Sequence, residues 1–233
     1  MAASRPERPS QQLSRSYRMF VRNPSAPPIN PQIVEALSQV CTSTLGHLRD
    51  YGFPRGLTPN VRPLKFVGTA VTVRLPHLDS TAVHVAADDL RPGDVLVVEQ
   101  SGDEHRSCFG GLVSFTAKAR GAVGAVIDGQ INDIEEMSGY GFPAYSRGVA
   151  AHTTRIAGIE GAINVPVSIG GVVIKPGDVV FADSDGVAIL DRGEALEIAD
   201  LLKQKEDAEI PAREAILAGS RISDFSGAAK FFA

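Results

Sequence analysis

The chain has 233 residues, which is enough for one sizeable domain or two small ones. Its 23 basic residues are outnumbered by 27 acidic ones, and the resulting formal charge of −4 argues against general nucleic-acid binding. No apolar run reaches the roughly 20 residues that a membrane helix needs. The two cysteines, Cys41 and Cys108, lie far apart, as is typical of a reduced protein. We therefore expect a cytoplasmic protein with no membrane partner.

The first 28 residues differ in composition from the rest of the chain. They contain five arginines, five prolines and a single acid, Glu7. Because so many prolines oppose a regular helix, residues 1–28 are predicted to form a flexible or partner-docked arm. No linker-like stretch divides the remainder, so residues 29–233 are predicted to form one domain.

The middle of the chain alternates between helical and strand patterns. In chain order, the hydrophobic spacing predicts a helix at 31–37, a helix from about 42, a strand at 65–74, a helix at 80–87, a strand at 94–99, a helix at 110–120, a strand at 122–127, a helix at 133–140 and a short strand at 142–145. Asp128 and Gly129 are predicted to form a tight turn after the 122–127 strand. This order predicts an α/β fold, in which a mixed sheet carries helices on its faces.

The C-terminal third begins with β-structure. Gly170 and Gly171 predict a two-residue turn between strands at 165–169 and 172–174. Further strands are predicted at 179–182 and 187–190. A long helix follows from residue 194 to about 210, where Pro211 is predicted to break or kink it before it resumes at 213–218.

The junction between the 122–127 strand and the following helix has two interpretations. Asn132 is a good helix N-cap, with Glu135 placed as in a capping box. Alternatively, Asp133 holds a divalent metal at the edge of the sheet. Ligation by oxygen alone would favour Mg²⁺ or Mn²⁺ over zinc. The residues themselves leave both interpretations open.

Two neighbouring segments also permit a functional or a structural role. In the Gly-rich segment CFGGLVS at 108–114, the backbone N–H groups that open a helix could bind an anion, most simply a substrate carboxylate. The same glycines could instead let the helix lie close to the sheet. The loop at 101–107 is rich in ionisable residues and follows a buried strand, which suits either a binding site or a solvated turn.

Three motifs, in this order, resemble the RraA-like proteins: CFGGLVSFTAKARGAVGAVIDG at 108–129, GFPAYSRG at 141–148 and NVPVSIGGVVIKPGD at 164–178. This family includes class II 4-hydroxy-4-methyl-2-oxoglutarate and 4-carboxy-4-hydroxy-2-oxoadipate aldolases, the regulator of ribonuclease E activity, and members mislabelled as demethylmenaquinone methyltransferases. The resemblance covers about residues 35–220. It implies a swivelling β/β/α sandwich with a mixed sheet, flanking helices and a C-terminal helix. It also implies homotrimers or hexamers with active sites at subunit interfaces.

The resemblance implies roles for residues at a fixed spacing. The aldolases carry Gly or Asp, then twenty residues, Arg-Asp, two residues and an acid. Here Gly111 is followed at that spacing by Asn132, Asp133 and Glu136. The match makes Asp133 the metal ligand and Glu136 the trailing acid, which would orient a water for proton transfer.

Other implied roles belong to backbone amides and to a more distant acid. The match places the amides of Leu112 and Val113 where the family binds the substrate carboxylate. A looser match makes Glu209 the acid that the family sends from a neighbouring subunit.

The chain departs from the aldolase pattern at Asn132, where the family has Arg. A neutral amide is a weaker donor to the substrate carbonyl than a guanidinium. Losing one such donor typically costs about 10²–10³ in rate. Arg106, Arg147 or His105 could supply the missing donor from another direction.

These observations predict a Mg²⁺- or Mn²⁺-dependent carbon–carbon lyase that acts on a small 2-oxo acid. The reaction would be retro-aldol cleavage of a 4-hydroxy-4-methyl-2-oxoglutarate-type substrate, oxaloacetate decarboxylation, or both, because the two share an enolate. Asn132 keeps two alternatives open. One is a non-catalytic RraA-type protein that binds a protein partner, and the other is a lyase or isomerase for a different acid.

Overall fold

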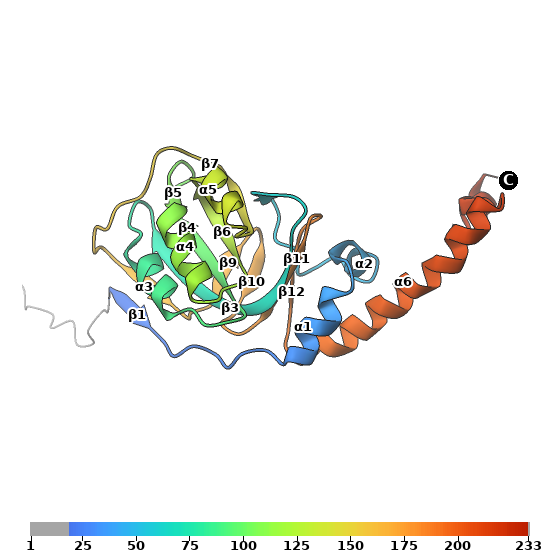
Figure 1. Cartoon of the computed structure of the whole chain (residues 1–233), viewed down its shortest axis with the longest axis horizontal. Coiled ribbons are helices and arrows are strands. Elements are labelled where there is room, and N and C mark those ends of the chain that lie inside the picture. Colours follow the sequence, from blue (N-terminus) through green and yellow to red (C-terminus); the bar gives the residue numbers. More distant parts are fainter. Residues whose placement is uncertain (1–18, 233) are drawn as a thin grey trace, which may run out of the picture.

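The computed structural model describes residues 19–232, and within them one large mixed sheet organises the molecule (Figure 1). Its strands follow the order β1-β8-β3-β4-β6-β7-β2, with β11 paired to β3 and β12, and β5 paired to β6. The bounds are β1 (Phe20–Arg22), β2 (Thr58–Pro59), β3 (Lys65–Pro76), β4 (Asp94–Ser101), β5 (Ser107–Phe109), β6 (Gly124–Ile131), β7 (Ala144–Val149), β8 (Gly161–Ile163), β11 (Val179–Asp183) and β12 (Val187–Leu190). A separate hairpin joins β9 (Val167–Ile169) to β10 (Val172–Ile174).

The centre of the sheet is parallel, as the alternating pattern predicts. Strands β3, β4, β6 and β7 pair in parallel, and helices connect them. These helices are α3 (Thr81–Asp89), α4 (Gly111–Ala119) and α5 (Ile134–Gly139). The central strands are buried on both faces, which explains their nearly continuous apolar sequence.

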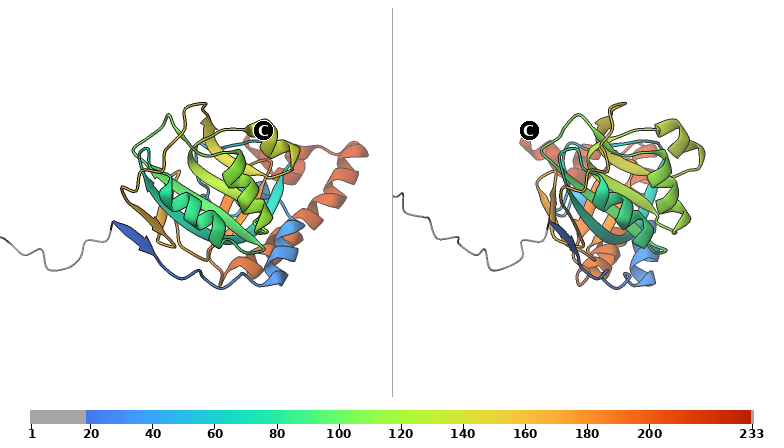
Figure 2. Two further views of the ribbon diagram at one scale, coloured as in Figure 1. Left: turned by 60° about the vertical axis from the view of Figure 1, so that its left-hand side comes forward. Right: turned by 90° about the vertical axis from the view of Figure 1, so that its left-hand side faces the viewer.

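The two faces of the sheet are covered differently. Helices α3, α4 and α5 pack on one face around residues such as Val98, Ile127 and Met137 (Figures 1 and 2). The β9–β10 hairpin contributes Ile169 and Ile174 to a second cluster, on the opposite face. The predicted mixed α/β fold, with helices on the sheet, is confirmed.

A third apolar cluster joins helices from the N-terminal and C-terminal parts of the chain. Here α1 (Pro31–Ser38), α2 (Thr42–Gly46) and the start of α6 (Ala195–Leu217) pack against β11 and β12. Beyond this cluster α6 extends away from the sheet towards α7 (Ile222–Ser226) and a final 3₁₀ turn, η1 (Ala228–Phe231) (Figure 1). No helix among residues 19–232 is both long and apolar enough to cross a membrane.

Three local predictions differ from the structure. Asp128 and Gly129 are not a turn, because β6 continues through them to Ile131 while its pairing with β7 absorbs an irregularity. Pro211 does not break α6, which continues to Leu217, so, of the predicted break or kink, the break is wrong. The exposed position of Pro211 lets water satisfy the carbonyl that the missing N–H leaves free. Within the predicted arm, β1 pairs in parallel with β8; residues 1–18 of that arm lie outside the described part.

Asp79 anchors the loop before β8 to the start of α3. Its fully buried carboxylate accepts hydrogen bonds from the N–H and hydroxyl of Thr81, at 2.9 and 2.5 Å. It also accepts from the N–H groups of Ala157 and Ile159, at 3.1 and 2.6 Å. Burial alone would raise the pKa of Asp79, but these hydrogen bonds outweigh it and lower the pKa to about 2.

We expect Asp79 to make the fold sensitive to acid. Because its pKa is lowered from 3.8 in the unfolded chain, its contribution is complete above about pH 4 and is lost as the pH falls through about 2. The shift corresponds to about 2 kcal/mol. The Asp79→Asn variant should be less stable near neutral pH, and its stability should fall less steeply between about pH 4 and pH 2.

Chemical unfolding followed by circular dichroism across this pH range measures the effect. Asp88→Asn is the matched control, because Asp88 is an exposed carboxylate within α3, the helix whose start Asp79 anchors. Parallel pH profiles for Asp79→Asn and the unaltered protein would show that Asp79 has no such role.

Candidate functional site

The candidate site forms where two strand-to-helix junctions meet. Strand β5 pairs in parallel with β6, and the N–H of Asn132 donates to the carbonyl of Phe109 at 3.1 Å. The chain then enters α4 at Gly111 and α5 at Ile134, and these helices contact one another. The structure therefore brings together the Gly-rich segment and the Asn132–Asp133 pair, which the family resemblance assigns to one site.

Asp133 is exposed and has an unusual backbone conformation. It is the N-cap of α5, with φ 56° and ψ 38°, and its side chain makes no capping hydrogen bond. The prediction that Asn132 caps this helix is therefore wrong by one residue. The left-handed conformation, which Asp tolerates better than most residues, turns the carboxylate towards α4, where its Oδ2 accepts the N–H of Gly111 at 2.8 Å.

The two glycines leave room for the polar side chains of the site. A Cβ on Gly111 would collide with the carboxylate of Glu136 and approach Asp133 Oδ2 to 3.1 Å. A Cβ on Gly110 would overlap the amide of Asn132. Both glycines are therefore needed because side chains from the next junction occupy the space beside them.

The N-terminus of α4 offers free backbone donors. Gly111 N–H is taken by Asp133, but within residues 19–232 the N–H groups of Leu112 and Val113 make no hydrogen bond. The helix dipole adds a partial positive charge at this end. A carboxylate could bind here, as predicted for Leu112 and Val113. Leu112 is 79% exposed and Phe115 is 52% exposed, so large apolar side chains border these donors.

Asn132 is held by its neighbours on both sides. The Ser107 hydroxyl lies 2.5 Å from Asn132 Oδ1, and Asn132 Nδ2 donates to Asp133 Oδ2 at 2.8 Å. Ser107 was not identified from the sequence, because its contact spans 25 positions and depends on the pairing of β5 with β6.

Tyr140 and Ser114 contact the candidate site beside Gly111. They too were not identified from the sequence. The Tyr140 hydroxyl is 2.5 Å from Ser114 Oγ and 3.0 Å from the carbonyl of Gly111. Burial raises the pKa of Tyr140, and the carboxylates of Glu136 and Asp133 raise it further, against the lowering effect of the Ser114 hydrogen bond. A serine inside an otherwise apolar helix face was the available signal for this contact.

The donor set fits magnesium or manganese better than zinc. No group of three or more His, Cys, Asp or Glu side chains in the described part of the chain is arranged to hold a metal. Asp133 and Glu136 are both exposed and both border Gly111. Mg²⁺ characteristically takes one or two protein carboxylates and fills its remaining positions with water and substrate. Asp133 Oδ1 accepts no hydrogen bond from residues 19–232 and would be free to contact a cation.

The proposed substitutes for the family arginine already have partners or point into solvent. They line a cleft of about 910 Å³ beside the carboxyl ends of β4 and β6. Arg106 forms an ion pair with Asp103, and Arg147 forms one with Asp128. The side chain of His105 is exposed. Each guanidinium therefore has its charge balanced by a carboxylate within the cleft.

Glu209 lies apart from the other predicted site residues. It forms an ion pair with Arg213 at 2.9 Å on α6. This helix packs on α1 and α2, across β11 and β12 from α4 and α5 (Figure 1). Within one chain, Glu209 is therefore not part of the cluster around Asp133.

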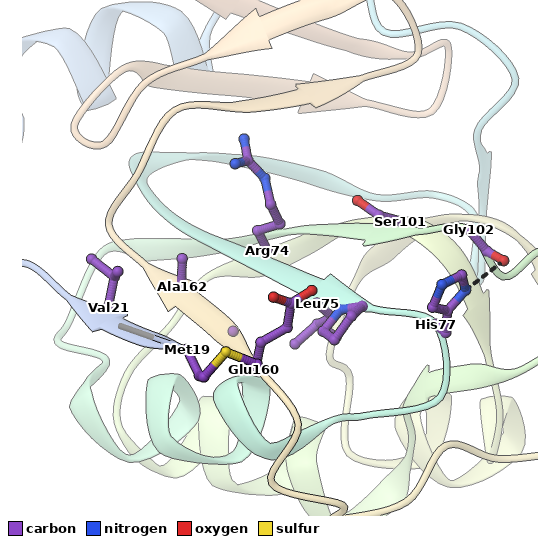
Figure 3. A pocket seen from close by; sticks show the side chains of 11 residues that line it. Met19, Val21, Arg74, Leu75, His77, Ser101, Gly102, Glu160 and Ala162 are labelled. Atoms are coloured by element: carbon purple, nitrogen blue, oxygen red, sulfur yellow. Dashed lines mark hydrogen bonds between the residues drawn. The ribbon is translucent and has the colours of Figure 1, made fainter. Parts of the chain in front are cut away.

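A separate cavity of about 450 Å³ lies beside β1 and β8 (Figure 3). Its lining includes Arg74, His77 and Glu160, and His77 Nδ1 is 3.1 Å from the carbonyl of Gly102. None of the predicted site residues lines this cavity, so it is distinct from the cluster around Asp133.

Comparison with known proteins identifies the family. A family model described as "RraA-like: Aldolase/RraA" matches residues 31–189. The chain belongs to the RraA-like family. This membership confirms the resemblance carried by the three sequence motifs.

Relatives of this RraA-like protein carry different names. A Halalkalibacterium halodurans protein that bears the name "Putative 4-hydroxy-4-methyl-2-oxoglutarate aldolase" is 39% identical over 162 residues, or 68% of this chain and 76% of the relative. An uncharacterised Pseudomonas syringae structure has a TM-score of 0.74 and 28% identity, covering 87% of this chain and 98% of that one. Streptomyces coelicolor RraAS2, described as an unusual member of the RNase ES inhibitor RraA family, has a TM-score of 0.71 and 31% identity, covering 79% and 96%.

We expect Gly111→Ala to disrupt the site although alanine normally favours a helix. Replacing glycine with alanine inside a helix usually stabilises it by up to about 1 kcal/mol. Here the added methyl group would displace the carboxylates of Glu136 and Asp133, so the melting temperature should fall or stay level. Gly139→Ala is the control, because open space surrounds Gly139 in α5. A gain in stability from Gly111→Ala equal to that of the control would contradict the close packing described.

Proposed function

We propose that this RraA-like protein is a carbon–carbon lyase that acts on a 2-oxo acid with the help of Mg²⁺ or Mn²⁺. One observation carries the proposal. The carboxylate of Asp133 accepts the first N–H of α4, and the next two N–H groups, of Leu112 and Val113, make no hydrogen bond to any described residue. A cation ligand and a carboxylate-binding helix terminus therefore lie side by side, which suits a substrate with a carboxylate next to a carbonyl.

Each group then has a definite task. The N–H groups of Leu112 and Val113 bind the substrate carboxylate. Asp133 supplies its free Oδ1 as metal ligand, and Mg²⁺ or Mn²⁺ bound there would act as a Lewis acid on the carbonyl oxygen. Glu136, directly or through a water, takes the proton from the C4 hydroxyl as the C3–C4 bond breaks, and a proton returns to C3. Oxaloacetate decarboxylation would use the same carbonyl polarisation.

A second candidate function follows from Asn132. The aldolase pattern has Arg at this position, and no unpaired guanidinium takes its place among the described residues that line the neighbouring cleft. A non-catalytic protein that binds a protein partner, or a lyase or isomerase for another acid, would tolerate this change. The retention of Asp133 and Glu136 favours the enzyme.

Release of pyruvate tests the lyase directly. The protein should form pyruvate from 4-hydroxy-4-methyl-2-oxoglutarate or from oxaloacetate when Mg²⁺ or Mn²⁺ is present, and chelator should abolish this activity. Asp133→Asn should lower turnover at least about 10²-fold, because the amide is a poor cation ligand. Glu135→Gln, in the same helical turn, should retain activity. Metal-independent turnover, or full activity of Asp133→Asn, would contradict the assignment, and no turnover of either substrate would favour the second candidate.

We also propose that the protein is a homotrimer or homohexamer in which a neighbouring copy covers the site and supplies Glu209. Leu112 and Phe115 beside the site are exposed, and so are Leu217 and Phe225 on the extended C-terminal helices. Such large apolar surfaces are typical of subunit interfaces.

Light scattering should therefore give three or six times the 24.6 kDa chain mass. Leu217→Glu should reduce that assembly, whereas Glu214→Gln, on the same exposed part of α6, should not. A monomeric unaltered protein would exclude a shared site.

A further inference from the structure

We propose that Ser107 and Asn132 form a hydrogen-bond relay that orients the carboxylate of Asp133. In this relay Asn132 is a positioning residue rather than the donor to the substrate carbonyl. The inference rests on the proposed function only in taking Asp133 as the metal ligand. It assigns a role to Ser107, and it gives Asn132 a different task from the arginine that it replaces.

The order of donors along the relay is fixed by chemistry. Asn132 Oδ1 can only accept, so the hydroxyl 2.5 Å away on Ser107 must donate to it. Nδ2 then faces Asp133 Oδ2 at 2.8 Å. Rotating the amide by half a turn would set its oxygen against the carboxylate oxygen, which is repulsive. The charge of Asp133 and the hydroxyl of Ser107 therefore favour the same orientation of Asn132.

Ser107 is a rigid starting point for this relay. Only 2% of the residue is exposed, and its N–H donates to the carbonyl of His152 at 2.8 Å. Its own carbonyl accepts the N–H of Thr154 at 2.9 Å and the Thr154 hydroxyl at 3.1 Å. The Ser107 hydroxyl also lies 3.2 Å from the carbonyl of Phe109. The Ser107 hydroxyl has one proton to donate, and Asn132 Oδ1 is the closer of the two acceptors.

The glycine before α4 makes space for the relay. A Cβ on Gly110 would lie 2.7 Å from Asn132 Nδ2 and 2.8 Å from its Cγ, closer than real contacts allow. A side chain at this position would push the amide away from Asp133. Gly110 is therefore required by Asn132, and Gly111 by Asp133 and Glu136.

The relay gives the two carboxylate oxygens of Asp133 different roles. Oδ2 accepts from Asn132 Nδ2 and from Gly111 N–H, both at 2.8 Å. Oδ1 is left to face a cation. Because the amide is neutral, Asp133 keeps its full charge for the metal, whereas an adjacent guanidinium would offset it. Groups that orient a ligating carboxylate in this way typically change metal affinity by 10–100-fold.

Binding of Mn²⁺ to the metal-free protein tests the relay without measuring activity. Electron paramagnetic resonance titration gives the Kd for the unaltered protein and for Ser107→Ala, Asn132→Ala and the double variant. Each single substitution should weaken binding about 10-fold. The double variant should bind no more weakly than Asn132→Ala, because both substitutions break one chain of hydrogen bonds. Ser107→Thr, which keeps the hydroxyl, should retain most of the affinity.

Ser146→Ala is the matched control. Ser146 is also 2% exposed in a strand, and its hydroxyl bonds locally to the carbonyl of Gly148 at 3.1 Å. Thermal unfolding of every variant separates a local effect from loss of the fold. If Ser107→Ala binds Mn²⁺ as tightly as Ser146→Ala, or if the effects of the two site substitutions multiply, the relay is wrong while the metal site stands. If the unaltered protein binds no Mn²⁺, both the relay and the metal-dependent function are wrong.

Discussion

The hydrogen bond from Gly111 N–H to the Asp133 carboxylate ties together the two junctions on which the candidate site depends. It requires the parallel pairing of β5 with β6, which sets the starts of α4 and α5 beside one another. It also requires glycine at position 111 and a left-handed backbone at Asp133. Such local strain persists only where surrounding structure enforces it, and it concentrates at functional sites.

Most of the order of strands and helices was predictable, because the central strands are apolar runs that the sheet buries on both faces. The short strands β1, β2, β5 and β8 were not predicted. The family resemblance assigned Gly111 and Asp133 to one site, and in the structure the two residues share a hydrogen bond. Local turn signals were less reliable. Asp128-Gly129 resembles a turn, but Asp128 pairs with Glu99 of β4, and β6 resumes its pairing with β7 at Gln130. The exposed position of Pro211 lets α6 continue. The contacts of Ser107 and Tyr140 could not be predicted, because they join residues brought together by tertiary structure alone.

Membership of the RraA-like family is compatible with a lyase and with a binding protein, so the choice depends on particular side chains. Asn132 removes the cation that the aldolase pattern places beside the substrate carbonyl. In compensation, its amide and the buried Ser107 hold Asp133 with one oxygen free. In the proposed reaction, the metal and the amides of α4 would therefore be the groups that stabilise negative charge on the substrate. The exposed apolar side chains around the site, Leu112 and Phe115, are suited to burial against another copy.

The proposed chemistry depends on Asp133 and the start of α4 holding a cation and a carboxylate together. Anomalous diffraction from crystals soaked with Mn²⁺ and pyruvate measures this most directly. We expect a Mn²⁺ peak about 2.1 Å from Asp133 Oδ1, as oxygen ligands of such cations require, and the pyruvate carboxylate on the N–H groups of Leu112 and Val113. A Mn²⁺ peak elsewhere in the molecule, or pyruvate bound away from α4, would contradict it.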